Sequence, residues 1–419
     1  MKLIRRIKYL EKIHNALKYL PVVVLTGSRQ VGKTSIMEML DFDNKLYLDG
    51  QDIDVQSLFV SYNTILEYLK INLNKSLSGY LFIDEFQYIN NVSTILKLLT
   101  DHNKNLKVIA SGSSSLDILQ NVKESMAGRV RVIEVYSLSF GEYLDFRNHD
   151  LHEKYYSYPS DIPYEAVDKQ IISSFKQFLI YGGYPRVALA EDFKDKIELL
   201  DDIYKIYLMK DVKSFIKNED SVPFNNLLRI LAAQSGNMFN INELSNTVKL
   251  PYNKVAEYIY LLEQMYIIKT VEPYTTNKRK EVSKMRKVFF LDTGLRNIIY
   301  NSFNDIDIRV DNGSIFENFV FLELMKVKRK TAEVKYYRTK DGSEIDFIYS
   351  DTDRLIPVEV KYKNFGGKVS IPALKNFSKI AEPDKPVVIN INLNQEYDDI
   401  RFLPGVMTEQ YFADSEKGG

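Results

Sequence analysis

The chain has 419 residues, enough for about two to four domains, and its 45% hydrophobic and 27% charged residues are typical of a globular protein rather than a disordered one. It contains no cysteine, which excludes disulfides, thiolate zinc sites, iron–sulfur ligation and cysteine nucleophiles. The 56 basic and 56 acidic residues give a formal charge of zero, so any anionic partner must be held by a local patch of charge.

The first 20 residues are predicted to form an amphipathic helix. Its inner face would carry apolar residues at helical spacing: Leu3, Ile4, Ile7, Leu10, Ile13 and Leu17. Charged residues interrupt every apolar stretch of this segment, so we expect no signal peptide. Nowhere do about 18 apolar residues follow one another, so we expect no membrane-spanning helix and a cytoplasmic location.

A glycine-rich loop follows the β-branched run Pro21 to Thr26 and precedes a segment of helical composition. Strand, loop and helix in this order are the context of a Walker A phosphate-binding loop. Glycines let backbone N–H groups point at phosphate oxygens, Lys33 can reach the β- and γ-phosphates as a catalytic cation, and the Thr34 hydroxyl can ligate Mg²⁺. The predicted ATP-binding residues of the loop are Gly27, Ser28, Arg29, Gln30, Val31, Gly32, Lys33, Thr34 and Ser35.

A second apolar strand, Tyr80 to Asp84, ends in two adjacent carboxylates, Asp84 and Glu85. Ligands bind at the carboxyl ends of the strands of open parallel sheets, so the pair is typical of a Walker B strand. Asp84 would bind nucleotide through Mg²⁺, and Glu85 would act as the general base that polarises the attacking water. This pair predicts hydrolysis as well as nucleotide binding.

Two further strands are predicted at Lys107 to Ala110 and Val130 to Val135. The first ends in a serine-rich segment that resembles the sensor 1 position of AAA+ proteins. Ser111 or Ser113 would contact the γ-phosphate or the attacking water there. A serine-rich helix cap explains the same residues equally well.

Several short motifs together resemble those of a prokaryotic AAA+ ATPase family with a largely uncharacterised C-terminal domain. They are the loop at 27–34, Phe-Ile-Asp-Glu-Phe-Gln at 82–87, the serines at 111–115, Ala127-Gly128-Arg129, the segment Ser137 to Tyr143, and Tyr181-Gly182-Gly183-Tyr184-Pro185. The resemblance runs from about Ile4 to beyond Lys361 and implies an AAA+ sheet with a helical lid. It also makes Arg129 a candidate arginine finger or phosphate sensor, although an ordinary surface arginine is an equal alternative.

The middle of the chain is predicted to be helical. After a polar connection between His149 and Pro163, helices at 167–180 and 194–216 would form the lid and its connector. Three helices at 224–235, 241–248 and 252–265, followed by a β-rich stretch, favour a winged helix. The hairpin at 276–287 would contact DNA phosphates through a group of cations: Lys278, Arg279, Lys280, Lys284, Arg286 and Lys287. A packing or protein-contact module is the alternative.

The last third resembles the core of PD-(D/E)xK nucleases in its order of charged residues. Glu317 lies in an apolar helical run, Asp346 in a strand, and Glu359 and Lys361 in the next strand. Residues two apart on a strand share a face, so Glu359 and Lys361 can meet Asp346. Glu317, Asp346 and Glu359 would bind Mg²⁺, and Lys361 would be catalytic by orienting or deprotonating water. A solvent-facing charge pair is the simpler alternative.

The expected fold class is α/β: an AAA+ P-loop parallel sheet with a helical lid, then a winged helix, then an α/β restriction-endonuclease-like domain. The predicted boundaries are 1–160 for the ATPase core, 161–220 for the lid and connector, 221–300 for the winged helix and 301–419 for the nuclease-like domain. We predict an ATPase that uses ATP and Mg²⁺ and acts on DNA; candidate partners are DNA and further copies of the chain. The alternative is an ATP-driven signalling or scaffolding switch with a catalytically inactive C-terminal domain.

Overall fold

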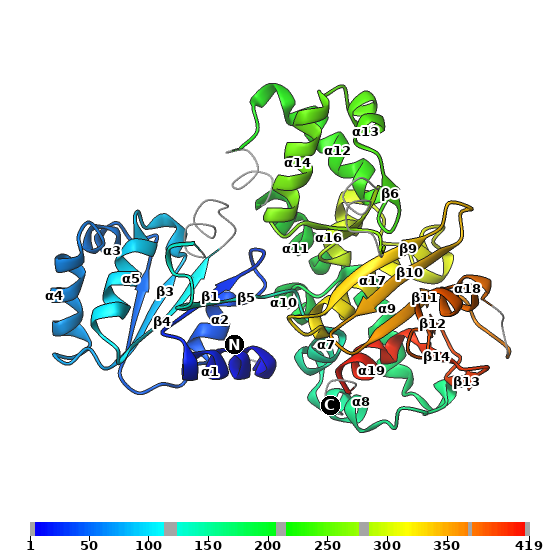
Figure 1. The fold of residues 1–419 in the computed structure, drawn as a ribbon, viewed down its shortest axis with the longest axis horizontal. Helices are drawn as coiled ribbons and strands as arrows, with labels where there is room; N and C mark the ends of the chain where they lie inside the picture. Colours follow the sequence, from blue (N-terminus) through cyan, green and yellow to red (C-terminus); the bar gives the residue numbers. More distant parts are fainter. Residues whose placement is uncertain (1–4, 113–123, 207–214, 276–284, 368–370, 415–419) are drawn as a thin grey trace. The chain divides into compact units, whose positions relative to one another are not determined.

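The computed structural model describes residues 5–112, 124–206, 215–275, 285–367 and 371–414. The chain divides into two compact units (Figure 1). Unit 1 is Met1–Tyr136 together with the short segment Gln264–Tyr266, and unit 2 is Ser137–Glu263 with Ile267–Gly419. No helix among the described residues has the length and apolar character that a bilayer crossing requires.

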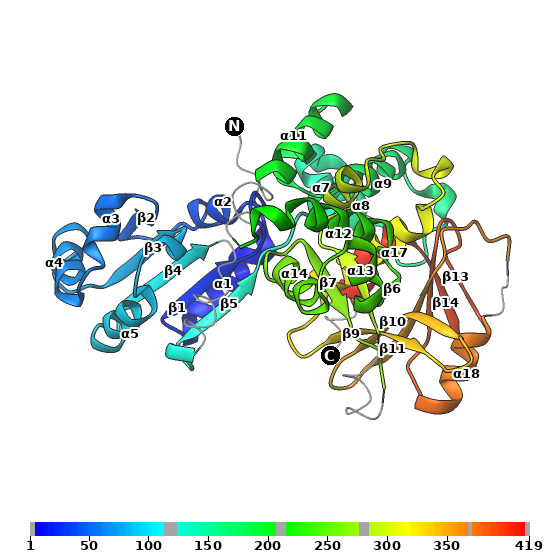
Figure 2. The same ribbon diagram turned by 90° about the horizontal axis from the view of Figure 1, so that it is seen from above.

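Unit 1 is built on a sheet of five parallel strands in the order β2-β3-β4-β1-β5 (Figures 1 and 2). In chain order the strands are β1 (Val22–Thr26), β2 (Lys45–Asp49), β3 (Gly79–Asp84), β4 (Leu106–Gly112) and β5 (Val130–Glu134). All five residues of β1 are buried, as expected of a central strand in a parallel sheet. The predicted parallel sheet of the N-terminal region is therefore confirmed.

Helices cover both faces of this sheet. They are α1 (Ile7–Tyr19), α2 (Lys33–Glu38), α3 (Ile53–Leu58), α4 (Tyr62–Asn72) and α5 (Val92–His102). Alternate strand residues such as Val22, Val24 and Ile83 pack with the buried side chains of α3, α4 and α5. On α1 the buried residues are Tyr9, Ile13, Ala16 and Leu17, whereas Ile7 is 59% exposed, so the predicted inner face was wrong at Ile7. Leu3 and Ile4 lie outside the described residues.

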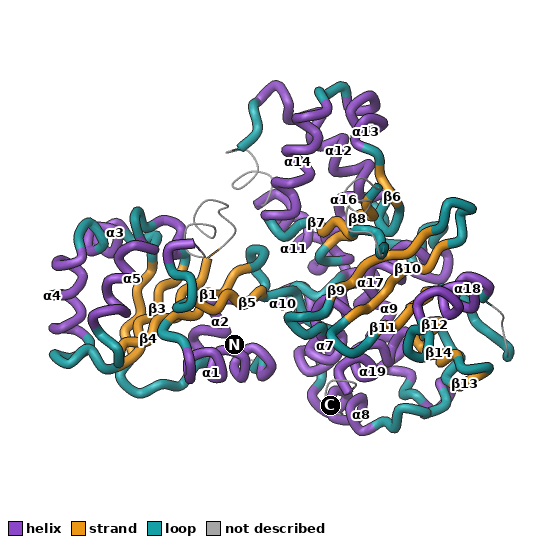
Figure 3. Tube along the Cα trace, viewed as in Figure 1, coloured by secondary structure: helices purple, strands orange, loops and turns teal. Residues whose placement is uncertain are grey.

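Unit 2 contains a mixed six-stranded sheet in the order β13-β14-β12-β11-β10-β9 (Figure 3). Its strands are β9 (Glu333–Arg338), β10 (Glu344–Ser350), β11 (Leu355–Val360), β12 (Val387–Asn390), β13 (Gln395–Tyr397) and β14 (Ile400–Pro404). The first three form an antiparallel meander, and β12 then pairs parallel with β11. Helix α17 (Asn312–Val327) precedes the meander and α18 (Pro372–Ala381) connects β11 to β12. The order is helix, three strands, helix, strand.

A smaller sheet of unit 2, in the order β6-β8-β7, accompanies three helices. Its strands are β6 (Met238–Phe239), β7 (Ile268–Val271) and β8 (Arg286–Phe290), and its helices are α12 (Ser221–Ala233), α13 (Ile241–Val248) and α14 (Tyr252–Gln264). The three helices lie where the sequence predicted them. Of the predicted hairpin at 276–287, residues 276–284 lie outside the described residues.

The other α-helices among the described residues of unit 2 are α7 (Phe140–Arg147), α8 (His149–Ser157), α9 (Lys169–Tyr181), α10 (Pro185–Leu189), α11 (Phe193–Ile206), α16 (Thr293–Tyr300) and α19 (Thr408–Asp414). The predicted connection from His149 to Pro163 is helical over its first nine residues, because the side chain of Asn148 caps α8 by accepting from Asp150 N. Helix α9 packs against α16 and α17. The helices expected to form a lid thus contribute to the core of unit 2.

The division of the chain falls at Tyr136 and Ser137, before the predicted boundary at residue 160. The segment after this point is anchored within unit 2 by the buried Glu409, which accepts from Ser139 Oγ at 2.8 Å and from Gly141 N at 2.7 Å. Asp292, also buried, accepts from Gly183 N at 2.8 Å. Two of the short motifs noted in the sequence, at 137–143 and 181–185, therefore join distant parts of unit 2 through buried hydrogen bonds.

Candidate nucleotide site and a second acid cluster

The loop between β1 and α2 has a backbone that requires glycine at both predicted positions. Gly27 has φ +146° and Gly32 has φ +90°, values that side chains rarely allow. A Cβ on Gly27 would lie 2.1 Å from Val135 O, so the loop is also closely packed. The buried Arg6 donates from Nη1 to Val31 O at 2.9 Å and so fixes the loop from outside. The geometry is that of a phosphate-binding loop.

Lys33 begins helix α2 and is buried against the loop. Its ammonium group donates to Gly27 O at 2.9 Å and to Ser28 O at 2.7 Å. The cation is thus held over the loop backbone, where N–H groups and the helix N-terminus add positive potential. This arrangement favours the binding of an anion such as a polyphosphate.

Asp84, at the carboxyl end of β3, accepts hydrogen bonds from several uncharged donors. Thr34 Oγ1 donates to its Oδ2 at 2.7 Å and Tyr47 OH donates to the same oxygen at 2.9 Å. Ser111 Oγ and the backbone N–H of Glu85 donate to Oδ1. The Thr34 hydroxyl and the Asp84 carboxylate, which sequence analysis paired as Mg²⁺ ligands, are therefore in direct contact. Their oxygen atoms are the ligand type that Mg²⁺ prefers, so these residues fit the ion.

Glu85 has a backbone conformation that costs energy. Its φ of +48° and ψ of +43° lie in the left-handed region, which is uncommon for a non-glycine residue. The Gln87 side-chain amide donates to Glu85 Oε2 and orients the carboxylate. Backbone strain of this kind concentrates at functional sites, where it directs a side chain.

Tyr47 is a residue of this site that the sequence analysis missed. Burial, and then the neighbouring Asp84 carboxylate, raise the pKa of its phenol well above the usual value, so the hydroxyl stays protonated and donates. Tyr47 lies on β2 opposite Phe82, and the pairing of β2 with β3 brings it to Asp84. No motif signals this residue, because its role depends on which strand lies next to β3.

Arg129 lies at the end of the sheet that is remote from the loop. Its carbonyl accepts from Val22 N at the start of β1, whereas the loop follows Thr26 at the end of that strand. The four residue steps from Val22 to Thr26 separate the two ends of the strand by about 13 Å. Arg129 Nε pairs with Asp101 Oδ1 at 2.6 Å and lowers the pKa of that carboxyl. Within one chain, Arg129 therefore does not join the other predicted site residues. Ser113 lies outside the described residues.

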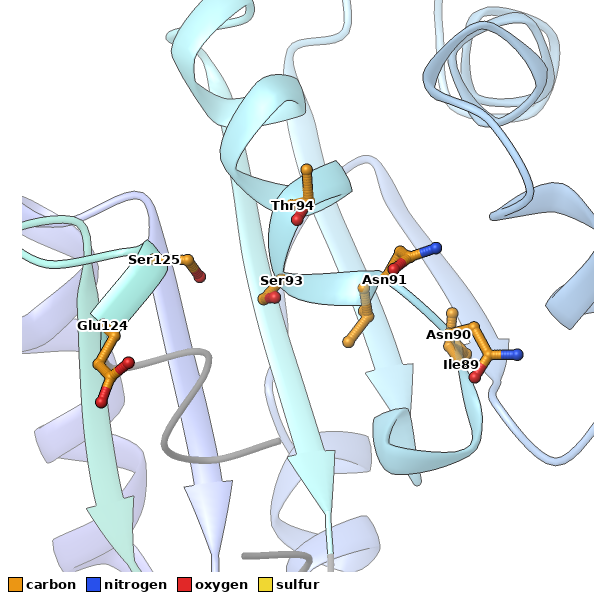
Figure 4. Close-up of a pocket in the computed structure, with 8 residues that line it drawn as sticks. Ile89, Asn90, Asn91, Ser93, Thr94, Glu124 and Ser125 are labelled. Atoms are coloured by element: carbon orange, nitrogen blue, oxygen red, sulfur yellow. The ribbon is translucent and has the colours of Figure 1, made fainter. Parts of the chain in front are cut away.

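A polar hollow of about 550 Å³ lies elsewhere in unit 1 (Figure 4). It is lined by Ile89, Asn90, Asn91, Val92, Ser93, Thr94, Glu124 and Ser125. These residues come from the start of α5 and from the segment before β5, and none was predicted to bind a ligand. The hollow therefore shares no lining residue with the predicted nucleotide site.

The predicted second site in unit 2 brings three of its residues together. Lys361 Nζ lies 2.6 Å from Glu359 Oε1 and 3.9 Å from Asp346 Oδ2. Asp346 Oδ2 also accepts from Val360 N at 2.8 Å, which follows from the antiparallel pairing of β10 with β11. Glu359 is 6% exposed, and its Oε2 has no hydrogen-bond partner among the described residues.

A lysine on another strand contacts this group of acids. Lys287, on β8, is 2% exposed, and its Nζ lies 2.9 Å from Glu317 Oε1, 2.7 Å from Glu344 Oε1 and 3.7 Å from Asp346 Oδ1. Burial by itself lowers the pKa of Lys287, but the surrounding carboxylates outweigh it and raise the pKa above the usual value. We call Glu317, Glu344, Asp346 and Glu359 the acid cluster. The prediction that Lys287 contacts DNA phosphate was wrong, because this side chain is buried among carboxylates.

Two members of the acid cluster have strongly shifted acidities. Burial and the nearby Asp346 carboxylate raise the pKa of Glu317 to about 8 and that of Glu359 to about 7. Among the residues that the structure describes, no three Asp, Glu, His or Cys side chains are grouped so that they could hold a metal ion. Glu317, Asp346 and Glu359 therefore do not form the predicted Mg²⁺ ligand set in this arrangement, since the Lys287 ammonium lies among them.

The remaining predicted DNA contacts are only partly covered by the structure. Arg286 is half-exposed and pairs with Glu272 through Nη2 at 2.7 Å. Four other cations lie outside the described residues: Lys278, Arg279, Lys280 and Lys284. On α8, the exposed His149 pairs with Asp145 and His152 contacts Gly141 O.

Comparison with known families divides the chain into three matched segments. Residues 20–144 match the model of an AAA domain. Residues 172–305 and 312–405 match two domains of unknown function, DUF8612 and DUF4143. The AAA segment includes β1 to β5 and the loop with Lys33, so the family match and the observed geometry agree.

Similar proteins occur in distant organisms. An uncharacterized protein of Methanocaldococcus jannaschii is 25% identical over 94% of this chain and 86% of its own length. Uncharacterized proteins of Haemophilus influenzae and Mycobacterium tuberculosis are 24% and 23% identical, over 82% and 86% of this chain and 82% and 74% of their own lengths.

Among solved structures, the Walker-type ATPase PABY2304 of Pyrococcus abyssi overlaps with 71% of this chain and 95% of its own at 14% identity and a TM-score of 0.47. A signal transduction ATPase with a tetratricopeptide repeat sensor, from Pyrococcus horikoshii, covers 78% of this chain and 46% of its own at 15% identity and a TM-score of 0.30. The loop geometry and the AAA match together define residues 20–144 as a P-loop ATPase domain of the AAA type.

Proposed function

We propose that this chain hydrolyses ATP with Mg²⁺ at the site formed by the P-loop and the end of β3. The observation that carries the proposal is the 2.7 Å hydrogen bond between Thr34 and Asp84, with Glu85 as the next residue. It joins the two predicted metal ligands, and the predicted general base follows directly in the chain. Mg²⁺, when bound, would neutralise charge on the phosphates.

Each side chain has a separate task in this proposal. Lys33 and the loop N–H groups bind the phosphates, and Thr34 with Asp84 would hold the metal ion. The hydroxyls of Tyr47 and Ser111 orient the Asp84 carboxylate. Glu85, which Gln87 orients, accepts the proton of the attacking water.

Phosphate release and nucleotide binding, measured on the same variants, test this proposal. Lys33→Ala should abolish both turnover and tight ATP binding, because the main cation at the phosphates is lost. Thr34→Ala should remove the Mg²⁺ dependence of binding. Turnover that survives Lys33→Ala would show that the site is elsewhere.

We also propose that unit 2 uses the ATPase cycle to act on DNA. The support is topological: helix α12, strand β6, helices α13 and α14, and strands β7 and β8 follow one another in the order of a winged helix, with β8 between β6 and β7. Tyr252 at the start of α14 is 48% exposed, and the neighbouring Lys254 pairs with Asp220. Salt-dependent DNA binding and DNA-stimulated ATP turnover would support the proposal. The absence of both effects with duplex, branched and single-stranded DNA would refute it.

Phosphodiester cleavage is a second candidate function for unit 2. The convergence of Asp346, Glu359 and Lys361 favours it, as does the order of α17, β9, β10, β11, α18 and β12. Nicking that is lost in Lys361→Ala, with ATP turnover retained, would establish it. A protein that hydrolyses ATP without DNA binding or nicking would instead be a nucleotide-driven signalling or scaffolding switch.

A further inference from the structure

The acid cluster already contains a cation that the chain itself supplies. Lys287 Nζ contacts Glu317 and Glu344 at 2.9 and 2.7 Å and lies 3.7 Å from Asp346. The Lys287 side chain is 2% exposed, so these carboxylates are its main partners. The Lys287 ammonium lies within ion-pair distance of three carboxylates. It occupies the position where a metal ion would bind the same oxygen atoms.

One carboxylate oxygen of the cluster has no partner in the part of the chain that the structure describes. Glu359 Oε2 is buried without a hydrogen-bond partner among the described residues, and an unpaired buried acceptor is unfavourable. Its other oxygen is engaged by Lys361. Around the four acids the described cations in ion-pair contact are Lys287, Lys361 and Arg338, the last at 2.9 Å from Glu344. Withdrawal of Lys287 would therefore leave Glu317 and Asp346 without that cation, in a cluster where Glu359 Oε2 already lacks a described partner.

We propose that Lys287 is the resident cation of the acid cluster and excludes a divalent metal ion from it, so that the cluster binds metal only when Lys287 is withdrawn. Lys287 belongs to β8 of the three-stranded sheet, whereas the acids belong to α17, β10 and β11. The position of β8 thus decides which cation the acids hold. The inference deepens the cleavage function proposed for this cluster and rests on it for its biological meaning, but metal binding tests it separately.

The test measures Mn²⁺ binding by calorimetry without nucleotide, in a Thr34→Ala background that removes a ligand at the P-loop. The Lys287→Met variant keeps the length of the side chain but not its charge. We expect it to bind Mn²⁺ at least about tenfold more tightly than its parent, with one additional site per chain and a higher Tm in Mn²⁺. Adding Asp346→Asn should abolish the gain.

A matched control is Arg286→Met, the neighbouring cation on β8, which pairs with Glu272 outside the cluster. It should bind Mn²⁺ as the parent does. Equal Mn²⁺ affinity with and without Lys287 would overturn the inference, as would a gain of the same size in the Arg286 variant. If the Lys287→Met variant gains metal without nicking DNA, the inference stands and the cleavage function fails.

A measurement on the unmodified chain covers the case in which the Lys287 variants do not fold. Reductive methylation followed by mass spectrometry should leave Lys287 unmodified, while Lys361, which is 48% exposed, reacts. The pattern should stay unchanged in millimolar Mn²⁺. Modification of Lys287 at the rate of Lys361 would show that it is not the resident cation.

Discussion

The buried carboxylates of the nucleotide site and of the acid cluster have different kinds of hydrogen-bond partner. In unit 1, Asp84 receives hydrogen bonds from the neutral hydroxyls of Thr34, Tyr47 and Ser111. In unit 2, ammonium groups of Lys287 and Lys361 face the carboxylates directly. Neutral donors orient a carboxylate and leave its charge available to a metal ion, whereas an ammonium group neutralises it. The carboxylate of Asp84 therefore keeps its charge, whereas the acid cluster contains its own cation.

The largest effect that would test this comparison is expected from Glu85→Gln. Loss of the general base should lower ATP turnover by about 10²–10⁴-fold while ATP binding changes little. Phosphate release and the binding of a fluorescent ATP analogue measure the two quantities. Glu67→Gln, the same change on the exposed face of α4, should leave both unchanged. Normal turnover in the Glu85 variant would remove Glu85 from the mechanism.

A second prediction concerns the pH dependence of unit 2. Burial raises the pKa of Glu323 from 4.5 to about 7, even though Lys326 opposes the shift. A raised pKa in the folded state means that this contribution to stability is fully present below about pH 4.5 and is lost as the pH rises to about 7. Glu323→Gln should remove this pH-dependent loss of unfolding free energy, which is on the order of 2 kcal/mol. Urea denaturation followed by circular dichroism between pH 5 and 8 measures it.

The control for this prediction is Glu333→Gln, which makes the same change at an exposed carboxyl. It should keep the pH dependence of the unmodified chain. If the Glu323 and Glu333 variants show the same slope of unfolding free energy against pH, Glu323 is not the group that titrates.

A smaller effect is expected from Tyr47→Phe. The variant removes one neutral donor to Asp84, worth about 1 kcal/mol, and should lower ATP turnover about three- to tenfold. The matched control is Tyr80→Phe on β3, whose ring stacks on Phe42 at the opposite end of the strand. Steady-state turnover of the two variants compares them, and equal rates would mean that the Tyr47 hydroxyl does not support Asp84.

The smallest effect is expected from Arg129→Ala in dilute protein. Its pair with Asp101 is partly exposed, so the unfolding free energy should change little. Turnover should also stay unchanged at low protein concentration, because Arg129 is at the remote end of the sheet in its own chain. A loss that appears only at high concentration would place Arg129 at the site of a second copy. A loss at every concentration contradicts the position described here.

Much of unit 1 could be predicted because its signals are contiguous in the sequence. The run Gly27 to Ser35 specifies a turn, a helix start and a phosphate cradle, and the strand before Asp84 follows from its unbroken apolar residues. Tyr47 could not be found in this way, since it reaches Asp84 only through the pairing of β2 with β3. The sequence contains no local mark of that pairing.

Unit 2 shows the same limit more strongly. The alternation of strand residues correctly brought Asp346, Glu359 and Lys361 together. Lys287, by contrast, was assigned to DNA because its neighbours in the sequence are basic. The structure buries it, because β8 lies between β6 and β7 and directs this side chain toward α17 and β10. A count of charges along the chain does not reveal which of them face inward.

The amino-acid sequence by itself determined the P-loop, the paired carboxylates after β3 and the order of elements, because each depends on residues adjacent in the chain. Only the tertiary structure decided which charges meet: Tyr47 with Asp84, Arg129 away from the loop, and Lys287 among the acids. The physical reason is that electrostatic interactions depend on distance and burial in space, and these are set by strand order and packing rather than by spacing along the chain.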